Sequence, residues 1–294
     1  RSVRGYVIWK YKIWCLSFVI YNYFVLLCAD TFLSFFLNMQ KPLILVTNDD
    51  GITAPGIRYL IEIMNELGEV VVVAPDSPQS GKGHAVTLDT TMYCDPMPSK
   101  NGATREYACS GTPADCVKIA KHEVLNGRMP DLCVSGINHG SNASINVIYS
   151  GTMSAAIEAG TEGIPAIGFS LLDPSWNADF SQARSYIKHI AEKVLANGLP
   201  KGMVLNVNIP NLHKEEIKGV KICRQARSRW IERFDKRVNP QGRVYYWMTG
   251  TFVNQDEGTD TDQWALENGY ISVVPVQFDL TAHQHLQTLQ QWDL

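Results

Sequence analysis

The stretch from Leu43 to Gly56, LILVTNDDGITAPG, constrains the fold more than any other part of this sequence. Its consecutive apolar residues, Leu43 to Val46, predict a strand buried on both faces, as is usual in parallel sheets flanked by helices. The run then breaks into Asn48, Asp49 and Asp50. In open α/β folds ligands bind at the carboxyl ends of strands, so we expect these polar residues to mark a functional site.

The segments that follow alternate between helix and strand patterns. Apolar residues recur at helical spacing between Ile57 and Leu67, and Val70 to Ala74 is a second all-apolar strand. The opening is therefore a βαβ unit, whose two strands are parallel. The same reasoning predicts further helices over 113–125, 153–160 and 180–197, and strands over 86–93, 107–109, 132–135, 166–170 and 204–209.

The composition of the 294 residues fits one large α/β domain or two smaller ones. A formal net charge of −3 gives no indication of a nucleic-acid surface, so we expect no stable nucleic-acid partner. The seven cysteines are scattered without CxxC spacing. We interpret them as reduced core residues of a cytoplasmic protein.

The first 38 residues pose a separate question. From Tyr11 to Leu37 the chain is rich in large apolar residues, as a signal anchor or transmembrane helix would be. However, the chain begins with Arg, a small-residue cleavage site is lacking, and Met39 directly precedes the first strand. We therefore interpret residues 1–38 as a spurious upstream extension, with Met39 as the true initiator. A genuine membrane anchor is the alternative.

Two further loops carry polar residues after predicted strands. Ser80 lies in the Pro-, Gly- and Ser-rich loop 75–84, and Asn138 lies in the loop 136–142. The alternative interpretation of each is an ordinary solvated or turn residue. Together with Asp49 and Asp50 they offer hard oxygen donors, a set that suits Mg²⁺, Mn²⁺ or Ca²⁺ better than zinc.

A predicted helix of small residues begins after Tyr149. The backbone N–H groups at this start, with the hydroxyls of Ser150 and Thr152, form a ready site for an anion. Ordinary N-capping, which needs one hydroxyl, is the alternative. Combined with the oxygen donors, this start predicts metal-assisted chemistry on a phosphate.

From Val220 onward, basic residues are interleaved with aromatic ones. The turn sequence 239–242 leads into Tyr245, Tyr246 and Trp247, which indicates a hairpin with aromatic strands. An isolated hairpin is marginal alone, so we predict an oligomerisation arm over about 220–262. Binding of nucleic acid is the alternative, but nearby acidic residues balance the charge. A strand over 270–274 and a helix from Thr281 complete the C-terminal segment 263–294.

Several separated motifs in this order resemble the survival protein SurE family. They are TNDDG at 47–51, APDSPQSGKGH at 74–84, SGTPADCV at 110–117, SGIN at 135–138, YSGTMSAA at 149–156, RQARSRW at 224–230 and YYWMTG at 245–250. The resemblance runs from Lys41 nearly to the C-terminus, and residues 1–38 have no counterpart in the family pattern.

This resemblance implies a single phosphatase domain over 39–294 with a Rossmann-like core at about 41–219. The core would be a mostly parallel α/β sheet with helices on both faces, and the C-terminal β-hairpin arm would join subunits into a homodimer or homotetramer. The implied activity is that of a cytoplasmic, metal-dependent 5'-nucleotidase that acts on nucleoside monophosphates. The implied ligands of one divalent cation, Mg²⁺ or Mn²⁺, are Asp49, Asp50, Ser80 and Asn138.

The mechanism we expect is attack on phosphorus by a metal-activated water, with Asp49 and Asp50 as catalytic residues. The residues expected to bind the phosphate or the rest of the substrate are Asn48, His84, Ser150, Gly151 and Thr152. His84 and Asp50 both remain candidates for the general acid.

Other functions fit parts of the same pattern. A non-catalytic nucleotide-binding module would keep the site without turnover, and a phosphatase could act mainly on other phosphomonoesters or short polyphosphate. A phosphorelay receiver would need an acceptor Asp where this chain has Ser135 to Asn138. A phosphatase with a covalent aspartyl nucleophile would require Asp-x-Asp rather than Asp-Asp-Gly.

Overall fold

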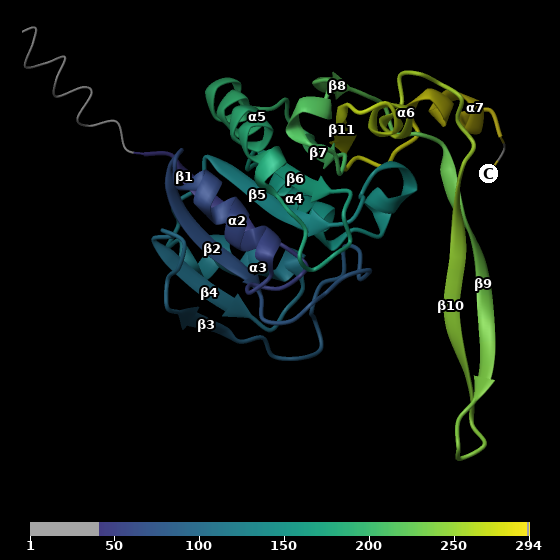
Figure 1. Ribbon diagram of the computed structural model, residues 1–294, viewed down its shortest axis with the longest axis horizontal. Coiled ribbons are helices and arrows are strands. Elements are labelled where there is room, and N and C mark those ends of the chain that lie inside the picture. The colour runs from purple at the N-terminus through teal and green to yellow at the C-terminus, as the bar shows by residue number, and fades with distance from the viewer. Residues whose placement is uncertain (1–40, 293) are drawn as a thin grey trace, which may run out of the picture. The chain divides into compact units, whose positions relative to one another are not determined.

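The computed structural model describes residues 41–292 and residue 294, so the extension predicted over 1–38 lies outside the described residues. Within the described part, a nine-stranded sheet has the order β3-β4-β2-β1-β5-β6-β7-β11-β8, and β9 and β10 form a separate hairpin (Figure 1). The sheet strands are β1 (Leu43–Thr47), β2 (Glu69–Pro75), β3 (Cys94–Met97), β4 (Arg105–Cys109), β5 (Leu132–His139), β6 (Ala166–Leu171), β7 (Met203–Ile209), β8 (Val220–Ile222) and β11 (Ile271–Gln277).

The sheet is mostly parallel. From β4 to β7 every neighbouring pair of strands is parallel, and the antiparallel pairs are β3 with β4 and β11 with β7. The sheet also takes in β8 and β11, which come after residue 219. The predicted α/β fold with a C-terminal hairpin is thus confirmed.

Helices cover both faces of the sheet. The helices are α2 (Pro55–Met64), α3 (Pro113–Ile119), α4 (Gly151–Thr161), α5 (Arg184–Asn197), α6 (Asp262–Glu267) and α7 (Leu286–Gln290). In β1, Ile44 and Val46 pack in the cluster that contains α2 and α5, whereas Leu43 and Leu45 pack in the cluster that contains α3 and α4. Each fully buried Leu, Ile or Val stabilises the fold by roughly 1.5–3 kcal/mol, so β1 anchors both layers.

The strand predicted over 86–93 is wrong, since that segment has no regular structure and the antiparallel edge strand is β3 instead. The reason is that side chains take up hydrogen-bonding groups of this segment that a strand would pair with its neighbour. Asp115 accepts hydrogen bonds from the backbone N–H (3.1 Å) and the hydroxyl (2.6 Å) of Thr87, and the Thr112 hydroxyl donates to the carbonyl of Ala85. Such bonds replace the ladder that a strand requires.

The predicted loop 136–142 begins inside a strand. β5 continues to His139, with an irregularity in its pairing to β6 between Ser135 and Asn138. A side chain on Gly136 would meet the carbonyl oxygen of Phe169 at 2.3 Å, so only glycine permits this close approach. The bulged strand carries Asn138 to the carboxyl edge of the sheet.

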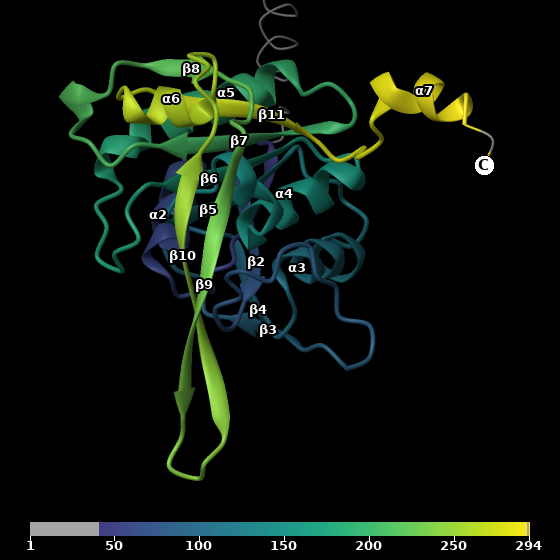
Figure 2. The same ribbon diagram turned by 90° about the vertical axis from the view of Figure 1, so that its right-hand side faces the viewer.

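The hairpin consists of β9 (Ser228–Val238) and β10 (Val244–Asn254). Both views show it as a long twisted ribbon that extends past the body of the domain (Figure 2). Its base is fixed by the buried carboxylate of Asp262, which accepts hydrogen bonds from the backbone N–H groups of Ser144 (2.7 Å) and Ala226 (2.9 Å).

Among the described residues, no helix is long and apolar enough to cross a bilayer.

Candidate functional site

The predicted site forms where the first strand meets the start of α4. Asp49 follows β1 and is 3% exposed, and its Oδ1 accepts a hydrogen bond of 2.6 Å from the Thr152 hydroxyl. A Cβ on Gly151 would lie 2.6 Å from the Cβ of Asp49, so the absent side chain lets the start of α4 approach this carboxylate. The motifs 47–51 and 149–156 therefore meet in space.

The second carboxylate joins two further predicted residues. Asp50 accepts a hydrogen bond of 3.2 Å from the backbone N–H of His139, and the nearby Ser80 side chain acts to lower the pKa of Asp50. Asn138, next to His139, donates its amide nitrogen to the carbonyl of Gly140 at 2.8 Å. This orientation leaves the amide oxygen of Asn138 as the acceptor available to a ligand.

Burial opposes the negative charge of both carboxylates. Desolvation, with the charge of Asp50 as a second cause, raises the pKa of Asp49 from 3.8 to about 6, although the hydrogen bond from Thr152 opposes this rise. Desolvation also raises the pKa of Asp50, and the hydrogen bond from His139 acts against it. A buried carboxylate next to a partly buried one is an electrostatic condition under which a cation is bound favourably.

The donor set fits a hard cation. Around the ends of β1 and β5, three buried side-chain oxygens have no hydrogen-bond partner within the described structure: Thr47 Oγ1, Asn48 Oδ1 and Ser135 Oγ. The described residues contain no group of three or more His, Cys, Asp or Glu arranged to hold a metal. A cation here would thus depend on two carboxylates with hydroxyl and amide oxygens, which suits Mg²⁺ or Mn²⁺.

The residues predicted to bind phosphate have definite partners in the structure. The Ser150 hydroxyl accepts a hydrogen bond of 3.0 Å from the N–H of Met153, which is ordinary N-capping of α4. The Thr152 hydroxyl is directed to Asp49. The Asn48 amide nitrogen donates to the carbonyl of Gly51 at 2.9 Å. Thr152 thus orients a carboxylate, a role that spacing alone did not indicate.

His84 lies in the loop after β2, and its partner lies further along α4. Its Nε2 is 2.8 Å from Oε2 of Glu158, and Nζ of Lys118 is 2.6 Å from the other carboxylate oxygen. Glu158 is seven residues after Gly151, or roughly 10 Å along the helix at 1.5 Å per residue. The hydrogen bond from His84 lowers the pKa of Glu158 from 4.5 to about 2. Sequence reasoning missed Glu158, although an acidic residue within the apolar pattern 153–159 was a usable signal.

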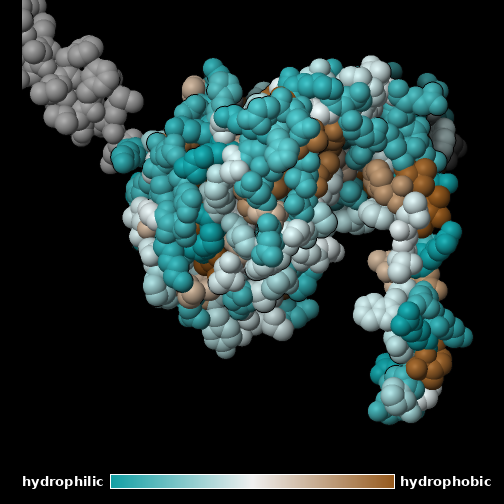
Figure 3. Space-filling model, in the orientation of Figure 1, coloured by the Kyte–Doolittle hydropathy of each residue, from teal (hydrophilic) through white to brown (hydrophobic). Residues whose placement is uncertain are grey.

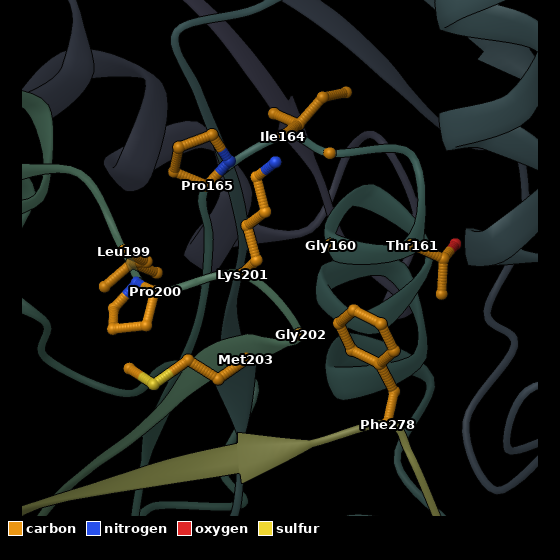
Figure 4. A pocket seen from close by; sticks show the side chains of 11 residues that line it. Gly160, Thr161, Ile164, Pro165, Leu199, Pro200, Lys201, Gly202, Met203 and Phe278 are labelled. Atoms are coloured by element: carbon orange, nitrogen blue, oxygen red, sulfur yellow. The ribbon is translucent and has the colours of Figure 1, made fainter.

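Another pocket, of about 380 Å³, opens at the opposite edge of the sheet, where β6 and β7 begin (Figure 4). Its lining includes Ile164, Pro165, Met203 and Phe278, and Lys201 is its charged member. None of the predicted site residues lines this pocket. Its lining contains no carboxylate, histidine or cysteine, and its polar side-chain groups are the Lys201 amine and the Thr161 hydroxyl.

Comparisons with known proteins find one family model, several similar sequences and a similar solved structure. The family model described as Survival protein SurE matches residues 44–232. A protein of Christiangramia forsetii named 5'-nucleotidase SurE is 69% identical over 88% of this chain and 99% of its own length. A protein of the same name from Flavobacterium psychrophilum is 66% identical over 87% and 99%. The crystal structure of the SurE protein from Aquifex aeolicus is 40% identical and superposes with a TM-score of 0.73, over 85% of this chain and 98% of that one.

Proposed function

The chain belongs to the survival protein SurE family, and on that premise we propose that it is a 5'-nucleotidase that uses one divalent cation, Mg²⁺ or Mn²⁺, to hydrolyse nucleoside 5'-monophosphates. The name of its relatives, 5'-nucleotidase SurE, supports the reaction class. The observation that carries the proposal is the juxtaposition of the buried Asp49 and the partly buried Asp50 with the start of α4, a place where anions bind well.

The residues that would hold the cation are Asp49, Asp50, Ser80 and Asn138. When bound, the cation supplies Lewis acidity toward a phosphoryl oxygen and makes water a better nucleophile at neutral pH. Thr152 fixes the rotamer of Asp49 through the bond of 2.6 Å between their side chains. Gly151 permits the approach of the two segments.

The phosphate would lie against the first turn of α4. The backbone N–H of Gly151 and the helix dipole favour negative charge there, and this preference strengthens as charge develops on phosphorus. Asn48 is 1% exposed and borders the same edge. His84 is paired to Glu158, about two turns from the helix start, and Asp50 is one of the proposed ligands of the cation, so neither candidate is favoured as the general acid.

The test is phosphate release from a panel of nucleoside 5'-monophosphates by the full chain, with Mg²⁺ or Mn²⁺ added and with a chelator. We expect release that the cation supports and the chelator stops. Asp49→Asn should nearly abolish turnover while the protein stays folded by circular dichroism. A binding module without catalysis is the second candidate: it would bind a monophosphate and a cation but release no phosphate.

We also propose that the protein forms a homo-oligomer and lies in the cytoplasm. The hairpin exposes large apolar side chains, among them Phe234, Val238 and Tyr246, which supports a homodimer or homotetramer formed through the 220–262 arm. Light scattering of the chain with and without residues 229–253 would test it. The five cysteines within the described structure are free thiols, which supports a reducing compartment such as the cytoplasm.

A further inference from the structure

A cleft of about 520 Å³ opens between the body of the domain and the base of the hairpin. Figure 3 shows a recess on this side, where the hairpin stands away from the body. Gly81 and Tyr149 line the cleft from the body, and Trp230, Glu232, Met248 and Gly250 line it from the hairpin.

Two residues that line the cleft are direct neighbours in the chain of residues of the proposed site. Gly81 follows Ser80, whose side chain acts to lower the pKa of Asp50, and Tyr149 precedes Ser150, the N-cap of α4. The N–H of Gly83 donates to the carbonyl of Tyr149 at 3.2 Å, which ties the two lining segments together. The part of a substrate that extends from its phosphate therefore has this cleft beside it.

Two aromatic rings lie at the cleft with their surfaces partly open. Tyr149 is 49% exposed and Trp230 is 38% exposed. The ring of Trp230 is held in place, since its Nε1 donates to Oδ1 of Asn146 at 2.9 Å and Phe252 packs edge-on against it at 5.6 Å between centroids. A preorganised aromatic surface of this kind favours a flat, aromatic ligand.

The strand register opens a gap in the hairpin face beside Trp230. Directly opposed residues of an antiparallel pair share a face, and here Trp230 opposes Phe252 while Glu232 opposes Gly250. A Cβ on Gly250 would contact Cε3 of the Trp230 ring at 3.5 Å, so the glycine leaves this part of the ring uncovered. The carboxylate of Glu232 stands beside this gap, and no ion pair neutralises it within the described part of the chain.

We propose, on the premise of the nucleotidase function above, that this cleft binds the nucleobase of the substrate and favours guanine. The base stacks on Trp230 and Tyr149. Glu232 accepts hydrogen bonds from the adjacent N1–H and N2 amino groups of guanine, because a carboxylate offers two acceptor oxygens to two neighbouring donors. Inosine monophosphate lacks the amino group, and ribose 5-phosphate lacks the whole base.

The experiment compares kcat/KM for guanosine 5'-monophosphate, inosine 5'-monophosphate and ribose 5-phosphate in the full chain with its cation. We expect the wild type to prefer the guanosine compound over the other two. Trp230→Ala should lower kcat/KM for both nucleotides by roughly 5- to 150-fold, the value of one base–aromatic stack, and leave ribose 5-phosphate unchanged. Trp230→Phe should keep most of the nucleotide activity.

Two further variants test the role of Glu232 and provide a control for the effect of Trp230→Ala. Glu232→Gln should remove the preference for the guanosine over the inosine compound. Gln263→Ala, in the neighbouring cleft that Trp230 also lines, should leave all three substrates unchanged.

The results distinguish failure of the proposed phosphatase function from failure of the proposed base site. Absence of phosphate release from all three substrates would refute the proposed function itself. Equal turnover of ribose 5-phosphate and the nucleotides, or equal losses for all three in Trp230→Ala, would overturn the base site and leave a phosphatase. A change of molecular mass of Trp230→Ala in light scattering would assign the cleft to a subunit contact and would also overturn the proposal.

Discussion

Gly151→Ala is the most direct test of how the site is built. A Cβ at this position would lie 2.6 Å from the Cβ and 2.8 Å from Oδ2 of Asp49. Carbon atoms in contact are separated by about 3.5–4.0 Å, so Asp49 or the start of α4 must move by about 1 Å. A displacement of this size at a reacting group lowers rates by about 100-fold, and we expect a loss of that order in kcat/KM for phosphate release.

The matched control is Gly160→Ala in the same helix. A Cβ there would meet a side-chain carbon of Val204 at 2.6 Å, the same approach but at the other end of α4. Both variants should lower the free energy of unfolding, by about 1–3 kcal/mol for an overpacked core. Only Gly151→Ala should lose the rate and require more Mn²⁺ for half-maximal activity. Equal kcat/KM in the two variants would refute the conclusion that the missing side chain of Gly151 makes room for the carboxylate of Asp49.

Two further predictions concern stability. The lowered pKa of Glu158, about 2 against 4.5 when unpaired, stabilises the fold fully above pH 4.5, and this contribution is lost as the pH falls from 4.5 toward 2. The difference in unfolding free energy between wild type and Glu158→Gln should therefore shrink between pH 6 and pH 3, whereas a constant difference would contradict the lowered pKa that His84 and Lys118 give to Glu158. Asp262→Ala leaves the buried N–H groups of Ser144 and Ala226 without an acceptor, so urea unfolding should show a loss of about 2–4 kcal/mol. Asp262→Asn, which keeps one acceptor oxygen, should lose less, and equal losses would contradict this account.

The local pattern of the sequence predicts much of the fold and of the site. The apolar run of β1 and the polar residues after it follow from burial and strand geometry, because both depend on neighbouring residues. The motif resemblance then joins Asp49, Asp50, Ser80 and Asn138, and the structure places their loops at one edge of the sheet. The family resemblance is confirmed by the family model and the relatives.

The other features of the fold and of the site depend on contacts between residues that are far apart in the sequence. The irregular path at Thr87 follows from its bond to Asp115, and the fixed base of the hairpin follows from a bond between Ser144 and Asp262. Propensity and periodicity carry no information about such pairs. The same holds for Thr152, which as a sequence feature could cap a helix, bind phosphate or orient a carboxylate. Only the proximity of Asp49 decides among these roles in the structure.

The position of β11 has a consequence for synthesis of the chain on the ribosome. β7 pairs with β6 on one side and with β11 on the other, yet residues 210–270, hairpin included, are made between β7 and β11. Throughout that interval β7 is an open edge with unpaired backbone groups, next to apolar surface that later becomes buried. A nascent chain that stalls or is cut before residue 271 would expose this edge and aggregate, so we expect quality control to act most strongly on products that end between 210 and 270.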